Sequence, residues 1–489
     1  MLINTVCLAV IVVFAACSKQ PVTGFFDKTS PECLILNGQV KGKDSISVLL
    51  PGTVEAIHAP WPRNSGERLL FDHLYETLIT VDCRGQVKAG LAESWSRGDG
   101  GRRWIFTVRG GAQFWDSTSV TAGDILESWQ YPLVEEAAVI AGIESTTVTG
   151  DRVVTVYLSQ ARRRVPRVLA SREFAVAKWC PGTHWPLGTG PYRVDHMKHR
   201  LPVSSGIAAR PATGSGSPVI QFVEASTFDT RDLLEGQLDV LTTADPAVLE
   251  YAESRPHLVT AALPWEKTYV LLSTSRVRTL RGGGKVRTLP PDLLAGLAQD
   301  AVRGDARGYH PPSWWENTRS CGELSPMVPG IPSILRGTYP TSGFHHIVYD
   351  LDDPVARDLA ERIVALAGTD PATSREAADL ASAVPGLLGT ENRTIAEGVT
   401  QDKFALSLRN GEDFAYVVAV PGQPLDPCYE IRKLLNRARW LVYSGSDLAR
   451  SLIPLVDTRR HVIADSSRVG LLRDSVGGIL ITNGLIEER

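Results

Sequence analysis

Histidines and carboxylates are the residues of this 489-residue sequence that could do chemistry, and their spacing limits what they can do. His345 and His346 are adjacent, and His196 and His199 are three residues apart. On a strand, the members of each pair point to opposite faces, so neither pair forms a chelate by itself. No HExxH helix or clustered carboxylate pattern accompanies them. We therefore predict no metal site.

The motifs of the common enzyme classes are also missing from the sequence. It contains no G-x-S-x-G nucleophile turn, no Walker phosphate loop and no zinc deaminase signature. The acidic residues are scattered over segments that we expect to be solvent-facing helices. We predict no catalytic residues, no cofactor and no enzymatic activity.

Two glycine-rich segments are candidates for phosphate-binding loops, but neither has the pattern of one. Residues 188–193 read G-T-G-P-Y-R, which lacks a Lys-Ser/Thr pair and does not open a helix. We expect a tight crossing turn there, with glycines that adopt positive φ. Residues 282–284 are three consecutive glycines, which predict a flexible hairpin turn.

Composition places the chain among folded globular proteins. It is 43% hydrophobic and 21% charged, with a formal net charge of -3, so it has no strong field for nucleic acid. The length predicts two to four domain-sized units. No stretch after the N-terminus reaches about 18 apolar residues, the length of a membrane span.

The N-terminus resembles a bacterial lipoprotein signal. The apolar run at 6–16 is short for a membrane span and ends in Phe14-Ala-Ala-Cys17, followed by polar residues. This pattern predicts removal of residues 1–16 and lipidation of Cys17, whose acyl chains would hold the chain on the bilayer. Residues 1–5 carry no Lys or Arg, and Phe14 stands where Leu is commoner. The alternative is an uncleaved N-terminal anchor; both interpretations place the body outside the cytoplasm.

Cysteine usage adds little to this picture. Apart from Cys7 and Cys17, five cysteines remain at wide spacing and without a CxxC pair: Cys33, Cys83, Cys180, Cys321 and Cys428. One or two disulfides fit an oxidising compartment, and the sequence leaves their pairing open.

The order of motifs resembles a known family. L-F-D-x-L-Y-E-x-L, L-A-E-S-W, W-x-F-x-V-R-x-G-x-x-F-W-D and V-T-A-x-D-I-x-x-S-W follow one another from Arg68 to Trp129. This series resembles the N-terminal signature of the bacterial extracellular solute-binding proteins of family 5, the oligopeptide-, dipeptide- and nickel-binding receptors of ABC importers. The segments 188–193 and 233–240 are also similar to this family. The resemblance covers roughly 45–485 and is poor over 277–345.

The resemblance implies an α/β, two-lobed periplasmic-binding-protein-like fold (type II, large peptide-binding class) with a discontinuous first lobe. We expect a tether at 17–43, a first lobe at 44–265 plus 455–489 with a subdomain at about 70–180, and a second lobe at 266–454. Within them we expect a helix over 68–79, a helix begun by Thr121, a strand at 346–350 and a helix at 355–366.

The family's ligand site suggests four residues. Trp115 and Asp116 belong to the F-W-D loop, where the Trp either stacks on ligand or packs between subdomains. In many peptide-binding members an Asp just upstream of the Asp426-Pro427 turn pairs with the peptide's ammonium, and here Gln423 occupies that position. Asp426 either substitutes for it or shapes the turn. A glutamine supplies no charge, so we expect any bound peptide to tolerate N-terminal acetylation, or the ligand to be another solute.

The implied function is a lipid-anchored, extracytoplasmic receptor. It would be a monomer in the cell envelope, on the periplasmic side in a Gram-negative cell. It would bind a peptide or small polar solute and pass it to an ABC permease and its ATPase. A degenerate receptor that acts as a sensor or envelope interaction lipoprotein is the alternative, and an enzyme on the same scaffold is a third hypothesis.

Overall fold

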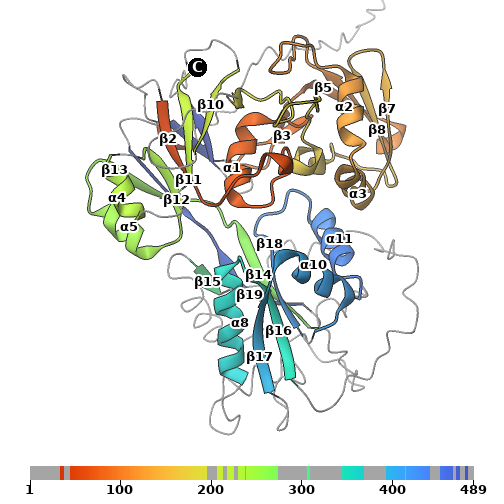
Figure 1. Cartoon of the computed structure of the whole chain (residues 1–489). Coiled ribbons are helices and arrows are strands. Elements are labelled where there is room, and N and C mark those ends of the chain that lie inside the picture. The colour runs from red at the N-terminus through yellow and green to blue at the C-terminus, as the bar shows by residue number, and fades with distance from the viewer. Residues whose placement is uncertain are drawn as a thin grey trace, which may run out of the picture.

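The computed structural model has two lobes, which Figure 1 shows one above the other, with few chain segments between them. It describes residues 33–37, 45–194, 206–212, 217–224, 229–236, 238–273, 306–308, 344–367, 393–413, 415–440, 452–465, 470–473 and 479–482. Cys17, the signal at 1–16, the glycine run at 282–284 and both His196 and His199 lie outside these residues.

A mixed seven-stranded sheet forms the centre of the first lobe. Its order is β13 (Leu258–Ala262), β20 (His461–Asp465), β12 (Val240–Thr243), β2 (Ser45–Leu50), β11 (Val219–Glu224), β10 (Gly206–Pro211) and β9 (Tyr192–Val194). Strand β2 pairs in parallel with both neighbours, and its last three residues are all buried. Such a strand needs cover on both faces. Helices α4 (Thr230–Leu234) and α5 (Pro246–Glu253) lie at one side, and α1 (Ser65–Leu74) also contacts β2.

A second, small sheet shortens the expected tether. Strand β1 (Leu34–Asn37) pairs with β21 (Gly470–Arg473), which pairs with β22 (Ile479–Thr482). The interpretation of 17–43 as an irregular tether is therefore wrong for its last part, because apolar residues at 34–36 join the C-terminal strands. A disulfide between Cys33 and Cys83 fixes this segment to the lobe. Cys428 is also disulfide-bonded, and Cys180 is free.

The subdomain expected at about 70–180 contains a four-stranded antiparallel sheet. Its order is β5 (Ala92–Gly98), β6 (Arg103–Val108), β8 (Val153–Leu158) and β7 (Ile143–Thr149). The helices α2 (Ala122–Trp129) and α3 (Pro132–Ala141) lie beside it (Figure 1). Smaller elements are the hairpin β3 (Ile79–Val81) and β4 (Val87–Ala89), and the 3-10 turns η2 (Ala56–His58), η3 (Asp99–Gly101), η4 (Arg167–Ala170) and η5 (Arg172–Phe174).

Local sequence explains how these elements begin. In β6 every second side chain is buried, which is the pattern of a half-covered strand. The predicted start of α2 is confirmed: the Thr121 hydroxyl accepts from the Asp124 N–H at 3.2 Å, and the Asp124 carboxylate accepts from the Thr121 N–H at 2.8 Å. This reciprocal pair satisfies two N–H groups that the helix leaves open.

Helix α1 is shorter than the expected 68–79. It starts at Ser65, because Asn64 caps it by accepting from the Glu67 N–H at 2.9 Å, and it ends at Leu74. Beyond Leu74 the chain is extended, and Glu76 forms a bridge with Val176. Tertiary pairing therefore overrides the helical periodicity of 75–79.

The glycines of the 188–193 segment serve a purpose other than the expected one. Neither Gly188 nor Gly190 has a positive φ. Instead, a Cβ on Gly188 would lie 2.2 Å from the Leu74 carbonyl oxygen, and one on Gly190 would lie 2.6 Å from it. The prediction of positive φ is wrong, and close backbone approach at the end of α1 is the reason for both glycines.

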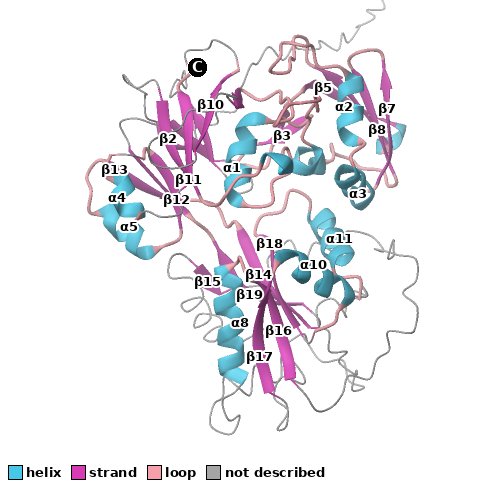
Figure 2. Cartoon of the chain, viewed as in Figure 1, coloured by secondary structure: helices cyan, strands magenta, loops and turns pink. Residues whose placement is uncertain are grey.

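The second lobe is a six-stranded sheet between helices. Its order is β15 (Ala306–Gly308), β19 (Leu452–Thr458), β14 (Lys267–Ser273), β18 (Ala415–Pro421), β16 (Phe344–Asp350) and β17 (Arg393–Val399). Helix α8 (Pro354–Ala367) covers one face, and α10 (Gln401–Asn410) and α11 (Pro427–Arg437) cover the other, as Figure 2 shows. Strand β14 serves both: Tyr269 and Leu271 pack toward α8, while Val270 and Leu272 pack toward α10 and α11. The predicted strand at 346–350 and helix at 355–366 are confirmed.

The chain passes between the lobes twice within the residues that the structure describes. The first passage joins β13 to β14 at 263–266, next to the expected boundary at 265. The second joins β19 to β20 at 459–460, whereas the expected return was at 455. The apolar run at 452–456 continues the second sheet up to Thr458, because it pairs there with β14.

Candidate functional site

A cleft of about 1470 Å³ lies between the lobes. Its walls include α1 and the 51–64 loop on the first lobe and the start of α8 and one face of α11 on the second. Ligand pockets are commonly a few hundred to about 1,000 Å³ and lie at domain interfaces. The cleft therefore has room for a solute larger than a single amino acid.

Glu67 organises the first-lobe wall from beneath. This side chain is fully buried, and its carboxylate accepts from the N–H of Arg63 at 2.7 Å and of Glu55 at 3.2 Å. The ring of His58 also lies against it, with Nδ1 at 2.5 Å. One carboxylate thus fixes both ends of the 55–63 loop, which carries Trp61 into the cleft.

Trp61 gives this wall an aromatic edge. Its ring centroid lies 5.3 Å from that of Tyr131 and 5.4 Å from that of Trp179, and its indole N–H donates to the Glu173 carbonyl at 3.2 Å. Arg172 lies nearby and pairs with the Asp72 carboxylate at 2.6 Å. The wall offers a rigid apolar surface beside a compensated charge pair.

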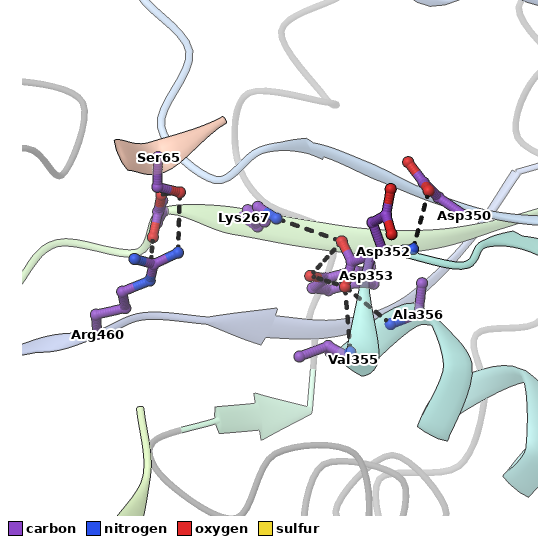
Figure 3. A network of polar contacts seen from close by, with 10 residues as sticks. Ser65, Lys267, Asp350, Asp352, Asp353, Val355, Ala356 and Arg460 are labelled. Atoms are coloured by element: carbon purple, nitrogen blue, oxygen red, sulfur yellow. Dashed lines mark hydrogen bonds and ion pairs between the residues drawn. The ribbon is translucent and has the colours of Figure 1, made fainter. Parts of the chain in front are cut away.

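The second-lobe wall is built around Asp353, before the first turn of α8. Its carboxylate accepts from the Tyr269 hydroxyl at 3.0 Å and pairs with the Lys267 ammonium at 3.3 Å. It also accepts from the N–H groups of Val355 and Ala356, each at 3.1 Å (Figure 3). These backbone bonds and the helix dipole stabilise the carboxylate at that position.

A polar network joins α1 to both passages between the lobes. Arg460 donates to the Ser65 hydroxyl at 2.9 Å, and Ser65 donates to the Glu266 carboxylate at 3.3 Å (Figure 3). Arg460 and Glu266 also form an ion pair at 3.4 Å. Burial opposes the ionisation of Glu266, but the charges of Arg460, Arg68 and Lys267 outweigh it and lower its pKa.

Helix α11 closes one end of the cleft by touching the first lobe. Asp426 caps the helix by accepting from the Tyr429 N–H at 3.1 Å, and it pairs with Arg162 of the first lobe at 2.9 Å. Two turns beyond Asp426, Lys433 pairs with Glu173 at 2.5 Å. Burial would raise the pKa of Glu173, yet the Lys433 ammonium and hydrogen bonds lower it to about 2. Both pairs join the lobes directly.

Residues 86–272 match the family model described as bacterial extracellular solute-binding proteins, family 5 Middle. Over these residues the chain is similar to family 5 of the bacterial extracellular solute-binding proteins. The predicted α/β fold of periplasmic binding proteins is confirmed as well.

Individual relatives are similar to this chain over limited stretches or at low identity. The probable deoxycholate-binding periplasmic protein YgiS of Escherichia coli (strain K12) is 38% identical over 80 residues, 16% of this chain and 14% of that protein. The structure of the pheromone receptor PrgZ has a TM-score of 0.59 at 11% identity and covers 90% of this chain and 100% of that one. The murein tripeptide binding protein MppA of Escherichia coli has a TM-score of 0.56 at 14% identity, with 90% and 99% covered.

The predicted site residues lie in different places. Gln423 and Asp426 line the cleft. Trp115 does not line the cleft. It is buried, and the centroid of its ring lies 5.6 Å from that of Tyr75. The backbone N–H of Trp115 donates to the Gly188 carbonyl at 3.1 Å. Asp116 is exposed away from the cleft and accepts from the Thr118 N–H and hydroxyl at 3.0 and 2.6 Å.

Several cleft residues escaped the sequence analysis, above all Glu67, Asp353 and the charged face of α11. The signal for α11 was present, since Glu430, Lys433 and Arg437 follow the Asp-Pro turn at helical spacing. Within the described ranges, no cluster of three metal-binding side chains occurs, and His346 contacts Glu397 instead. None of the described helices has the length and apolar character required to cross a bilayer.

Proposed function

We propose that this chain is an extracytoplasmic lipoprotein that captures a peptide or similar polar solute between its lobes and delivers it to an ABC permease with its ATPase. The observation that carries the proposal is the cleft, whose walls come from both lobes. A solute that contacts both walls binds the closed arrangement better than the open one and so shifts the population toward closure. The chain acts as a monomer and uses no enzymatic chemistry.

Copurification tests this function directly. The full chain is purified from its native envelope without denaturation, and small molecules released by unfolding are identified by mass spectrometry. We expect a peptide or polar solute whose return to the stripped chain reduces the radius of gyration in small-angle scattering. If the purified chain releases no solute, and if no solute from envelope extracts reduces its radius of gyration, the alternative of a sensor or interaction lipoprotein is favoured.

The lipid anchor is tested separately from ligand capture. Replacing Cys17 by serine is expected to release the chain from membranes or to leave its precursor uncleaved, because the acyl chains attach to that thiol. Detergent partitioning and intact-mass measurement give the result. The matched control is Cys180→Ser, which removes the free cysteine of the described region and should leave partitioning unchanged. Membrane retention of a normally processed Cys17→Ser chain would contradict lipidation.

A further inference from the structure

Most charged groups of the cleft are paired within the protein. The pairs Asp72–Arg172, Lys267–Asp353 and Glu173–Lys433 each hold opposite charges within 3.3 Å. Apart from the exposed Asp352, two cleft-lining carboxyl groups of the second lobe differ from these. Asp350 accepts one N–H, from Asp352 at 3.1 Å, and Glu430 accepts no hydrogen bond from any residue that the structure describes.

The position of these two groups relative to Arg437 decides their net charge. Glu430 and Arg437 lie on α11 at positions i and i+7, which share a helix face, and both line the cleft. Asp350 ends β16, and the charge of Arg437 interacts with both Asp350 and Glu430. Lys433 and Lys267 also act on these two groups, but they form their ion pairs with Glu173 and Asp353. When Glu430 and Asp350 are both ionised, the Arg437 guanidinium is therefore shared between two carboxylates.

Burial makes the ionisation of both carboxyl groups costly in the empty cleft. Burial raises the pKa of Glu430 to about 7, against the lowering influence of Lys433 and together with the like charges of Glu173 and Asp426. Burial also raises the pKa of Asp350, and Asp352 and Asp353 add to the effect. A partly buried carboxylate without a charged partner is unfavourable unless a cation reaches it or a proton neutralises it.

We propose that Glu430 and Asp350 form a subsite for a cationic group, an ammonium or guanidinium, on the captured solute. The inference rests on the proposed capture function and names one chemical feature of the solute. Gln423 supplies no charge, and the Asp426 carboxylate is held by Arg162 and by the N–H of Tyr429. Asp352 also lines the cleft, but it is exposed to solvent. In the described part of the second lobe, Glu430 and Asp350 are therefore the cleft carboxylates left for this role.

A stability measurement first separates ligand binding from a structural role. The double variant Glu430→Gln, Asp350→Asn is expected to unfold at pH 8 no more easily than the wild type. The pKa of Glu430 is higher in the fold than in the unfolded chain, so the fold loses stability as pH rises through 4.5 to about 7, and removing the ionisable group removes that loss. A clear drop in the urea midpoint would mean that these carboxylates hold the fold together, and it would overturn the subsite.

The binding test uses three probes on the ligand-stripped full chain: trilysine, spermidine and trialanine. Calorimetry at low salt compares the wild type, the double variant, and the charge-matched control Glu135→Gln, Asp402→Asn, whose residues are exposed and outside the cleft. We expect trilysine or spermidine to bind the wild type and the control within twofold of each other. The double variant should bind at least tenfold more weakly, because a charge-assisted contact is lost.

The three probes distinguish failure of this inference from failure of the proposed function. Trialanine binding without trilysine or spermidine binding would keep peptide capture and overturn the cationic subsite. Spermidine binding that depends on Glu430 and Asp350, without binding of either peptide, would keep the subsite and count against peptide capture. Equal affinity of wild type and double variant for both cationic probes, or no binding of them at millimolar concentration, would overturn the subsite.

Discussion

Replacing Glu67 by alanine is expected to destabilise the protein by about 2 to 4 kcal/mol and to abolish solute capture. The change leaves the N–H groups of Glu55 and Arg63 without their acceptor and removes the nearer of the two carboxylates that contact His58. The 55–63 loop then loses what fixes both of its ends, and Trp61 loses its place on the cleft wall. Among the cleft residues that the structure describes, Glu67 is the fully buried one whose side chain accepts from two backbone N–H groups.

Chemical denaturation and solute titration of the same variants measure this effect. Glu67→Gln keeps the shape and one acceptor oxygen, so its loss should be smaller than that of alanine. Glu135→Ala is the control, because Glu135 is an exposed residue in the first turn of α3 and should contribute less than about 1 kcal/mol. An alanine variant at position 67 as stable as this control would contradict an organising role for the buried carboxylate.

The second large effect is expected at the two ion pairs that join α11 to the first lobe. Arg162→Gln together with Lys433→Gln breaks both the Arg162–Asp426 and the Lys433–Glu173 pair. Charge-assisted contacts of partly buried groups contribute about 1 to 2 kcal/mol each, so losing two should shift the ligand-free population toward open forms by roughly 30-fold or more. Closure would then depend on solute alone.

Small-angle scattering of the ligand-free chain measures the shift as an increased radius of gyration. Arg152→Gln with Arg231→Gln is the control, because it breaks two ion pairs of similar length, each within one lobe: Arg152–Glu93 and Arg231–Asp229. Raising the salt concentration should open the wild type partway, since exposed parts of the pairs are screened. Identical scattering of both double variants and the wild type would show that these contacts do not hold the lobes together.

Local sequence predicted the elements whose formation depends on near neighbours. The Thr121 and Asp124 pair marks the start of α2, and the apolar spacing of 355–366 marks α8, because caps and amphipathic faces are encoded within a few residues. The motif order from Arg68 to Trp129 then indicated the family, and with it the two-lobed fold. These signals need no knowledge of distant partners.

Features that depend on residues far away in the chain could not be predicted from local sequence. The strand at 34–37 exists because residues 470–473 pair with it, and α1 ends at Leu74 because Glu76 meets Val176. Asp426 faces Arg162, which lies 264 positions earlier, so the sequence could not tell a ligand-facing carboxylate from a lobe-joining one. Trp115 packs on Gly188 and Tyr75 for the same reason, although its motif also fitted a stacking role.

The two passages between the lobes have a mechanical consequence. β13 pairs with β20 in one lobe and β14 pairs with β19 in the other, and the bonds from the Leu263 N–H to the Arg460 carbonyl and from the Glu266 N–H to the Thr458 carbonyl continue the ladder between them. The connection is thus one two-stranded antiparallel ribbon that continues from the sheet of one lobe into the sheet of the other. A ribbon bends and twists readily, but sliding by one residue would turn every side chain to the opposite face. The lobes can therefore rotate about their connection, while translation past one another is forbidden by the register of four strands.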